Sequence, residues 1–353
     1  MNNREGFASR MGFILIAAGC AVGIGNVWRF PFITGQYGGG AFVLIYLFFL
    51  VIFGLPALMA EFAVGRASGR GIARSFDVLE RKGHKWHTAK YPMLAGNYLL
   101  MMFYTTVSGW MFYYFYRMAF VGDLTEMSAD QVGGAFGSML GSAGTQTGWM
   151  IFATLLGMGI VSLGLQKGVE SITKKMMAAL FVIMVLLAIR VLTLDGAVEG
   201  LKFYLLPDFD RMVKNGIGET VFAAMGQAFF TLSLGIGAMT IFGSYIKKEH
   251  SLTKEALWIC TLDTVVALLA GLIIIPACFA FKVEPGQGPG LVFVTLPNVF
   301  AQMPAGRLCG AAFFLLLSFA ALSTLIAVFE NIVAFWMDLK GYSRKKSRCY
   351  QHH

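Results

Sequence analysis

Residues 17–31 read AAGCAVGIGNVWRFP, in the middle of an apolar segment that extends from residue 11 to residue 34. Three glycines and an asparagine therefore fall where a membrane-spanning helix would be at mid-depth, and each glycine costs about 1 kcal/mol of helix propensity relative to alanine. A second apolar segment, 218–246, has the same character at its centre, where residues 229–237 read FFTLSLGIG. The sequence predicts two helices that are interrupted inside a membrane.

The spacing of these two interruptions indicates a binding site between them. Irregular backbone at membrane depth persists only where it lines a cavity or is buried in protein. Small residues in a single span have a second interpretation, which is close packing of neighbouring helices. Two interrupted centres five spans apart match an inverted repeat of five spans, and such segments point to the substrate site in transporters of that architecture.

Composition excludes the main alternatives to a membrane protein. Hydrophobic residues make up 57% of the 353 residues and charged residues 13%, whereas a soluble domain carries roughly a quarter charged. Such a chain cannot cover a water-exposed surface with polar groups, and it is too hydrophobic to be disordered. Eight segments are long and apolar enough to cross a bilayer, and we expect each to be helical: 11–34, 41–64, 92–119, 148–165, 172–194, 218–246, 256–281 and 308–337.

The net charge of +9 follows the predicted topology and does not indicate a nucleic-acid surface. Most Lys and Arg residues lie in alternate connections and in the terminal segments; loop 65–91 is rich in them, whereas 121–147 has none. The positive-inside rule therefore predicts a multi-pass protein of the cytoplasmic (inner) membrane with both termini in the cytoplasm. Segment 283–306, rich in Pro and Gly, is expected to be extracellular and to fold back against the helices.

Interrupted helices offer a specific chemistry to a ligand. Freed N–H groups attract a carboxylate, and freed carbonyls attract Na⁺ or an ammonium group, so an amino-acid zwitterion finds both partners. Four ionisable residues stand out inside the predicted spans: Arg29, Glu61, Asp263 and Glu330. We expect Glu61 to accept hydrogen bonds from the freed N–H groups. Asp263 has two interpretations, a salt bridge with Arg29 and a cation ligand or counter-ion.

Nothing in the sequence indicates an enzyme. All five His residues lie in predicted loops or in the tail, no nucleophile–base pair is visible, and no Walker motif is present. The glycines at 23 and 25 lack the third glycine and the preceding strand of a dinucleotide-binding site. We therefore expect no catalytic residue and no cofactor.

Residues 19–31, 229–237 and 320–324, the last reading AALST, resemble the neurotransmitter:sodium symporter family, and especially its bacterial amino-acid members. The resemblance covers the chain to about residue 347. It implies an all-α polytopic membrane protein with broken helices and a five-plus-five inverted repeat. The single transmembrane domain, 1–353, would comprise a first repeat (11–194), an incomplete second repeat (218–337) and a cytoplasmic tail (338–353).

The same resemblance implies sodium-coupled symport of a hydrophobic or aromatic amino acid by alternating access. Two sodium sites would be built from oxygen ligands, as a hard cation requires. The first would use Ala21, Asn26, Thr231, Asp263 and the substrate carboxylate. The second would use Gly19, Val22, Ala320, Ser323 and Thr324.

The implied substrate-binding residues come from both interrupted helices and from two continuous ones: Cys20, Ala21, Ile24, Gly25, Leu100, Tyr104, Phe230, Thr231, Ser233, Ile236, Thr324 and Val328. Gly25 and Tyr104 would bind the substrate carboxylate. Four residues are implied for the gates, Arg29 at the outer mouth and Arg4, Tyr245 and Asp338 at the cytoplasmic mouth.

Three departures from the family pattern affect these expectations. Asp263 stands where relatives commonly carry Asn, and its fixed negative charge predicts that chloride is not required. Cys20 stands where some relatives carry Asn. The chain ends after eight predicted spans, whereas the family has eleven or twelve. The alternative function is therefore a non-transporting truncated remnant, or a regulatory membrane scaffold of the same fold.

Overall fold

The computed structural model describes residues 10–246, 249–286, 288 and 290–340. Those residues form helices joined by short connections, and the only extended pairing among them is an isolated bridge between Gly39 and Pro207. The all-α fold predicted from the sequence is confirmed.

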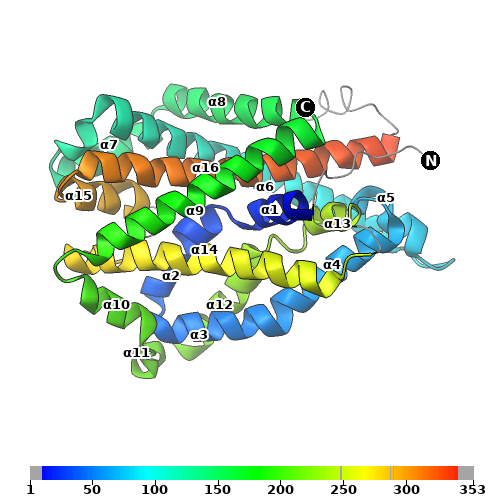
Figure 1. Ribbon diagram of the computed structural model, residues 1–353, viewed down its shortest axis with the longest axis horizontal. Coiled ribbons are helices and arrows are strands. Elements are labelled where there is room, and N and C mark those ends of the chain that lie inside the picture. Colours follow the sequence, from blue (N-terminus) through cyan, green and yellow to red (C-terminus); the bar gives the residue numbers. More distant parts are fainter. Residues whose placement is uncertain (1–9, 247–248, 287, 289, 341–353) are drawn as a thin grey trace.

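Helices coincide with each of the eight predicted spans (Figure 1). They are α1 Arg10–Ala21 with η1 Gly25–Arg29 and α2 Phe30–Gln36; α3 Gly40–Phe49 with η2 Leu50–Gly54 and α4 Leu55–Ser68; α6 Lys90–Tyr116 with η4 Arg117–Val121; α8 Ala143–Ser162; α9 Ser171–Leu192; α12 Ile217–Thr231 with α13 Ala238–Gly243; α14 Leu252–Ala280; and α16 Gly306–Lys340. The connections hold α5 Ile72–Leu79, η3 Trp86–Ala89, η5 Asp123–Thr125, α7 Ala129–Gly141, η6 Leu165–Glu170, α10 Ala197–Leu205, α11 Phe209–Lys214, η7 Leu291–Thr295 and α15 Leu296–Ala301.

Five of these units satisfy the length and apolarity that a bilayer requires. Four are continuous helices, Gly40–Ser68, Gly168–Leu192, Leu252–Ala280 and Gly306–Lys340, and the fifth is the bent pair of α1 with η1 and α2. The other three predicted spans are helical but do not meet both requirements, and α12 is only 15 residues long. Helix α6, for example, carries Asn97, Thr105 and Ser108, which are all buried. Polar residues on such helices are turned into the protein, where they find hydrogen-bond partners.

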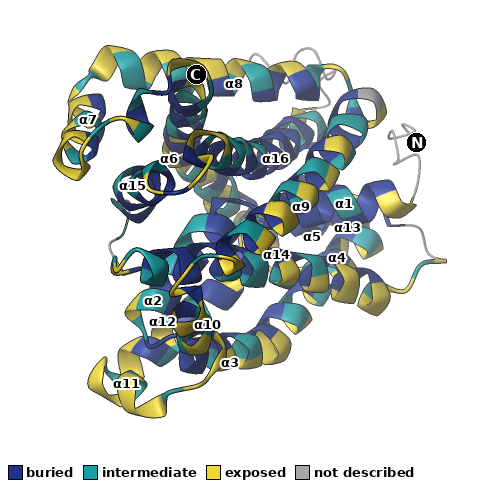
Figure 2. Cartoon of the chain, turned by 60° about the vertical axis from the view of Figure 1, so that its left-hand side comes forward, coloured by how far each residue is buried: buried dark blue, intermediate teal, exposed yellow. Residues whose placement is uncertain are grey.

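Helix α16 lies inside the bundle and organises the helices around it. It packs against α6, α8, α9 and α1, and α1 also contacts α14 (Figure 1). Among the four continuous candidate spans α16 is the most buried and α3–α4 the least. Figure 2 shows α16 mostly in the buried colour, whereas the outer helices alternate between buried and exposed faces. The interrupted helix α1 is therefore enclosed by protein on several sides.

Helix α16 continues to Lys340, three residues beyond the predicted end of the last span at residue 337. Segment 283–306 folds back against the helices, as the sequence predicts, and forms a short helical unit, η7 and α15, which contacts α16 and α7. Phe293 of this unit is fully buried among aromatic rings, with its centroid 5.0 Å from that of Tyr114 and 5.9 Å from that of Trp28.

Candidate functional site

The first interruption lies between α1 and η1. Helix α1 ends at Ala21, residues 22–24 are non-helical or marginal, and the axis turns by 53° before the chain continues through η1 and α2. The side chain of Asn26 caps the break, because its Oδ1 accepts the Gly23 N–H over 3.1 Å. The Ile24 N–H donates to the Tyr104 hydroxyl over 3.2 Å. Freed amides at the break are thus satisfied by side chains, as buried backbone groups must be.

Position 23 has no room for a side chain unless its neighbours move. A Cβ atom there would lie 2.5 Å from the Tyr104 hydroxyl and 2.6 Å from Thr324 Oγ1. Gly25 is equally confined, since a Cβ would lie 2.6 Å from the Phe230 ring. The two glycines let helices α6, α12 and α16 approach the backbone of the break.

The second interruption lies between α12 and α13. Residues 232–237 leave the helix with three left-handed conformations, at Ser233 (φ 52°), Gly235 (φ 88°) and Gly237 (φ 72°). Glu61 of α4 accepts the Gly235 N–H through Oε1 over 2.7 Å. The prediction that Glu61 accepts hydrogen bonds from freed amides is confirmed at this break.

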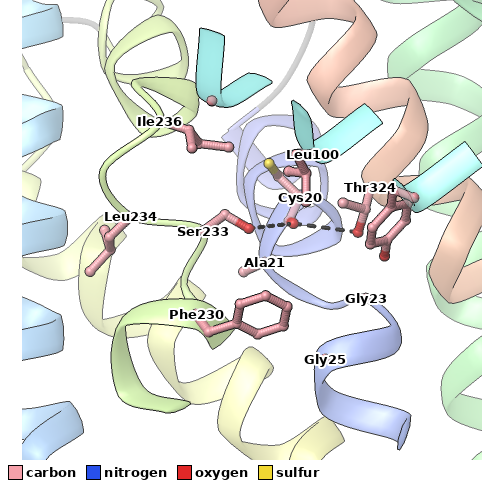
Figure 3. A pocket seen from close by; sticks show the side chains of 12 residues that line it. Cys20, Ala21, Gly23, Gly25, Leu100, Phe230, Ser233, Leu234, Ile236 and Thr324 are labelled. Atoms are coloured by element: carbon pink, nitrogen blue, oxygen red, sulfur yellow. Dashed lines mark hydrogen bonds between the residues drawn. The ribbon is translucent and has the colours of Figure 1, made fainter. Parts of the chain in front are cut away.

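A cavity of about 290 Å³ lies between the two interruptions. Its walls are mainly apolar, and Figure 3 shows the side chains that line it. The lining residues are Cys20, Ala21, Gly23, Gly25, Gly96, Leu100, Tyr104, Phe230, Ser233, Leu234, Ile236 and Thr324. The Cys20 carbonyl accepts hydrogen bonds from Ser233 Oγ (3.1 Å) and Thr324 Oγ1 (3.5 Å), so polar groups from α1, from α16 and from the non-helical stretch 232–237 meet at one wall.

A buried polar cluster joins the first interruption to α12 and α14. Asn26 Nδ2 donates to Asp263 Oδ1 over 2.7 Å and lies 3.0 Å from Thr231 Oγ1. The Thr231 hydroxyl donates to Asp263 Oδ2 over 2.8 Å. Exposure of the three residues is 0–1%. The structure thus brings together three of the four residues predicted for the first sodium site, and the fourth, Ala21, lines the adjacent cavity.

A second cluster of oxygen atoms joins the first interruption to α16. Ser323 Oγ lies 2.9 Å from the Ala320 carbonyl and 3.2 Å from the Val22 carbonyl. Thr324 Oγ1 lies 3.4 Å and 3.5 Å from the same two carbonyls. A Cβ on Gly19 would lie 3.5 Å from Ser323 Cβ, so Gly19 is also adjacent. Neutral oxygens in such a buried arrangement suit a hard monovalent cation.

Arg29 lies on the other side of the cavity wall, and its partners are residues other than Asp263. Its guanidinium donates to the Gln227 side chain and stacks over the Phe230 ring, 4.9 Å from the centroid. No ion pair joins Arg29 to Asp263 in the described part of the chain, and Asn26 and Thr231 occupy both carboxylate oxygens instead. The salt-bridge interpretation of Asp263 is therefore wrong.

At the end of α16, Asp338 contacts the connection before α5. Its Oδ2 accepts the Gly71 N–H over 3.0 Å, and its Oδ1 lies 4.0 Å from the Arg70 guanidinium. Tyr245 follows α13 and is partly buried. The predicted gate residue Arg4 lies outside the described residues.

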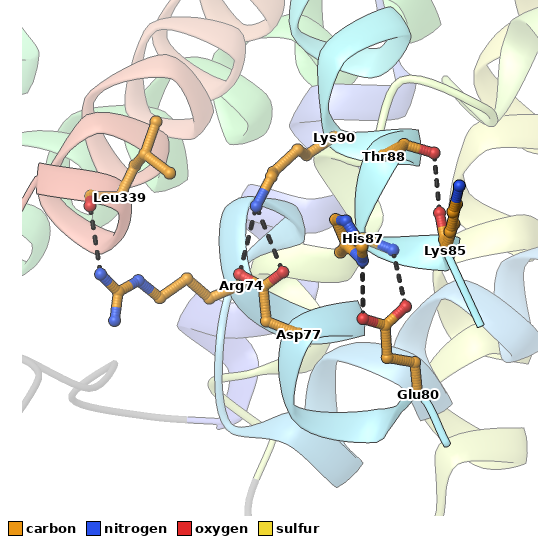
Figure 4. A network of polar contacts seen from close by, with 8 residues as sticks. All are labelled: Arg74, Asp77, Glu80, Lys85, His87, Thr88, Lys90 and Leu339. Atoms are coloured by element: carbon orange, nitrogen blue, oxygen red, sulfur yellow. Dashed lines mark hydrogen bonds and ion pairs between the residues drawn. The ribbon is translucent and has the colours of Figure 1, made fainter. Parts of the chain in front are cut away.

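Polar contacts hold α5 and η3 together beside this end of α16 (Figure 4). The imidazole Nδ1 of His87 lies 2.6 Å from Glu80 Oε1, and the backbone N–H of His87 donates to Glu80 Oε2 over 3.0 Å. Lys90 lies 3.2 Å from both oxygens of Asp77. The Arg74 guanidinium donates to the Leu339 carbonyl, near the end of α16, over 3.1 Å. These contacts hold the segment with α5 and η3 together and attach it to α16.

Most residues predicted to bind the substrate meet at the cavity, and three do not line it. Ile24 faces a neighbouring cavity of about 190 Å³, which Arg29 and Phe230 also line. Thr231 belongs to the Asp263 cluster. Val328 is fully buried in α16 and is not among the described residues that line the cavity.

Three lining residues escaped the sequence reasoning: Gly23, Gly96 and Leu234. Gly96 could have been found from helical spacing, because it shares one face of α6 with Leu100 and Tyr104 at intervals of four. Gly23 stood in the quoted motif. Leu234 lies in the non-helical stretch, where no periodicity applies.

Comparison with known proteins identifies the family. Residues 4–132 and 128–351 match the Sodium:neurotransmitter symporter family. The uncharacterized sodium-dependent transporter YhdH of Bacillus subtilis is 38% identical over 331 residues, which are 93% of this chain and 71% of YhdH. An uncharacterized sodium-dependent transporter of Haemophilus influenzae is 34% identical, over 98% of this chain and 76% of its own length.

A solved structure agrees with the sequence matches. The crystal structure of MhsT in complex with L-phenylalanine superposes with a TM-score of 0.89 at 40% identity, over 99% of this chain and 78% of MhsT. The resemblance expected from the interrupted helices is therefore confirmed. The chain belongs to the sodium:neurotransmitter symporter family, a family of multi-pass membrane transporters.

Proposed function

We propose that the protein couples the movement of Na⁺ to the transport of a hydrophobic or aromatic L-amino acid across the cytoplasmic membrane. The observation that carries this proposal is the apolar cavity between two interrupted helices, with an oxygen cluster on either side. Its volume of about 290 Å³ lies just below the ~300–1,000 Å³ that small-molecule sites occupy.

The charged ends of an amino acid have partners at the first interruption. Gly25 begins a helical segment and lines the cavity beside the Tyr104 hydroxyl, so an anionic carboxylate is favoured there by the helix N-terminus and by a hydroxyl donor. The Cys20 carbonyl, at the end of α1, offers an acceptor to an ammonium group. We assign Ala21, Thr231 and Ser233 to the same polar wall.

The side chain of the substrate would lie against Leu100, Phe230 and Ile236. The side chains of these residues contain only carbon atoms, so an apolar substrate side chain loses less hydration than a charged one on entering. The relative MhsT was crystallised with L-phenylalanine. We extend that chemistry to this chain as a class, and Ile24, Thr324 and Val328 complete the assignment on the neighbouring walls.

The two oxygen clusters are assigned to Na⁺. The first would use Ala21, Asn26, Thr231 and Asp263 next to the substrate carboxylate. The second would use Gly19, Val22, Ala320, Ser323 and Thr324. Because Asp263 already places a carboxylate beside the first site, a further anion would be repelled, and we propose that chloride is not required.

Coupling would arise by alternating access between the two faces of the membrane. Na⁺ can shift the conformational equilibrium only by binding one state more tightly than the other. Both clusters include backbone or side-chain atoms of the first interruption and atoms of another helix, so their geometry depends on how those helices are placed. We assign residues 11–194 and 218–337 to the two repeats, Arg29 to the outer gate, Arg4, Tyr245 and Asp338 to the inner gate, and both termini to the cytoplasm.

Two measurements test this function. Binding of labelled L-phenylalanine, L-tyrosine, L-tryptophan and L-leucine to purified protein is compared in Na⁺ and in K⁺, and uptake into liposomes is driven by an inward Na⁺ gradient. We expect binding and concentrative uptake in Na⁺, unchanged when gluconate replaces chloride. Equal affinity in Na⁺ and K⁺ would refute sodium coupling. Stronger competition by glycine or glutamate than by phenylalanine would refute the substrate class.

A further inference from the structure

The cavity wall at Ile236 is held by a side chain from outside the interrupted helix. Ile236 lies between Gly235 (φ 88°) and Gly237 (φ 72°), so a regular helix cannot continue through it. Its carbonyl accepts a hydrogen bond from Asn97 Nδ2 of α6 over 2.7 Å. Glu61 of α4 accepts the N–H of the neighbouring Gly235. The position of Ile236 therefore depends on tertiary hydrogen bonds more than on its own helix.

Asn97 is itself fixed by a second buried amide. Its Nδ2 also donates to the Met93 carbonyl over 2.7 Å, and its Oδ1 accepts from Asn331 Nδ2 of α16 over 3.0 Å. The exposure of Asn97 is 1% and that of Asn331 is 3%. Buried amides are costly unless paired, and a chain of paired amides has a defined geometry. The chain Asn331–Asn97–Ile236 links two continuous helices to the non-helical stretch.

This chain reaches the part of the cavity that would contact a substrate side chain. Gly96, directly before Asn97, lines the cavity, and a Cβ on it would lie 3.5 Å from Ile236 Cγ2. Figure 3 shows Ile236 and Phe230 entering the cavity from the two ends of the non-helical stretch, with Leu100 across from Ile236. A shift of the Ile236 backbone would change the width of the cavity between Ile236 and α6.

We propose that Asn97, oriented by Asn331, is a positioning residue that fixes Ile236 and thereby sets the size of side chain that the cavity accepts. This inference rests on the proposed function, because it concerns selection among apolar amino acids. When Ile236 is held in place, a small substrate side chain keeps its contacts with it. When Ile236 is free to move, a small substrate side chain loses these contacts, whereas a large one still fills the cavity.

Three variants separate positioning from simple stability. Asn97→Leu keeps the branched shape of the side chain but removes the donor to Ile236. Asn331→Leu leaves that donor in place and removes only the partner that orients it. The double variant removes both buried amides, so neither is left unpaired. Thr105→Val is the matched control, because Thr105 is buried on the same helix and its hydroxyl donates only to the Met101 carbonyl of α6 among the described residues.

The affinities for L-leucine and L-tryptophan are measured in Na⁺, together with the melting temperature. In Asn97→Leu we expect leucine affinity to fall about three- to tenfold more than tryptophan affinity, in keeping with the loss of one hydrogen bond. Asn331→Leu should lower the melting temperature with a smaller change in the affinity ratio. The double variant should recover part of the melting temperature and retain the altered ratio.

The proposal would be overturned if Asn97→Leu lost affinity for leucine and tryptophan equally. It would also be overturned if the ratio of the two affinities followed the melting temperature across the three variants. A similar shift in Thr105→Val would overturn it as well. Hydrogen exchange of peptides covering 232–238, measured without substrate, tests independently whether Asn97 holds this stretch in place. Faster exchange there in Asn97→Leu supports positioning, and unchanged exchange refutes it. If the unmodified protein bound no amino acid, the proposed function would fail, and this exchange would still decide whether Asn97 holds Ile236.

Discussion

The side-chain amide of Asn26 lies 2.7 Å from the carboxylate of Asp263, and this contact joins the first interrupted helix to α14 across 237 positions of sequence. Both side chains are fully buried. Asp263 accepts through one oxygen from Asn26 and through the other from Thr231, so its carboxylate has partners from two further helices. Removal of its charge is therefore expected to act on the whole cluster.

Asp263→Asn should make amino-acid binding dependent on chloride. The substitution keeps the shape of the side chain but removes the fixed negative charge beside the first proposed sodium site, so that a mobile anion becomes favourable there. We expect at least tenfold weaker L-phenylalanine binding in gluconate than in chloride. The control is Thr264→Val, since the Thr264 hydroxyl donates to the Cys260 carbonyl of its own helix. Identical binding of the Asn variant in both anions would count against the assignment.

Gly23→Ala should abolish amino-acid binding. The new methyl group would lie 2.5 Å from the Tyr104 hydroxyl and 2.6 Å from Thr324 Oγ1, so the break or both side chains must move. Gly159→Ala on α8 is a suitable control, because no atom of the described chain lies within 4 Å of a Cβ there. Binding is measured in Na⁺ for both. Retention of near-normal affinity by Gly23→Ala would show that the site tolerates the displacement.

Ser323→Ala should raise the Na⁺ concentration needed for half-maximal binding. The hydroxyl lies between the Ala320 and Val22 carbonyls, and the loss of one oxygen ligand of this kind is worth about 1–2 kcal/mol, or about tenfold. Ser318→Ala on the same helix is matched in burial, and its hydroxyl donates to the Phe314 carbonyl. A sodium titration that is the same in both variants would exclude Ser323 as a ligand.

The contact between Glu80 and His87 should make stability depend on pH. Desolvation raises the pKa of the Glu80 carboxyl, but hydrogen bonds from the backbone and ring of His87 together outweigh it and lower the pKa below the usual 4.5. A carboxyl with a depressed pKa in the folded state stabilises the protein above its unfolded pKa, and this contribution is lost as pH falls through the folded pKa.

The corresponding measurement is the melting temperature between about pH 6 and about pH 3.5. The melting temperature of the unmodified protein should fall further over this interval than that of Glu80→Gln, which lacks the titrating group. Glu126→Gln, which alters an exposed side chain, should behave as the unmodified protein does. Parallel curves for the unmodified protein and Glu80→Gln would show that the contact adds nothing to stability.

Local sequence determined the features that depend on backbone preference and hydrophobicity. The glycines and Asn26 within 17–31 and the glycines within 229–237 disfavour helix wherever they occur, so both interruptions could be placed without knowledge of their neighbours. Long apolar runs specify helices in the same way, because hydrocarbon leaves no other means of satisfying the backbone. The same segments carry the resemblance to the family, and that resemblance implied most residues of the cavity.

Tertiary structure alone decided how side chains distant in sequence share their partners. Arg29 and Asp263 are opposite charges in predicted spans, but they do not pair. In the structure Arg29 contacts Gln227 and Phe230. Asp263 accepts hydrogen bonds from Asn26 and Thr231. The link from Asn331 through Asn97 to Ile236 has no local signature, since an isolated Asn in a helix is compatible with many partners. Glycine patterns act through the conformational energy of their own residues, whereas these contacts arise only when separate helices bring polar groups within hydrogen-bond distance in an apolar interior.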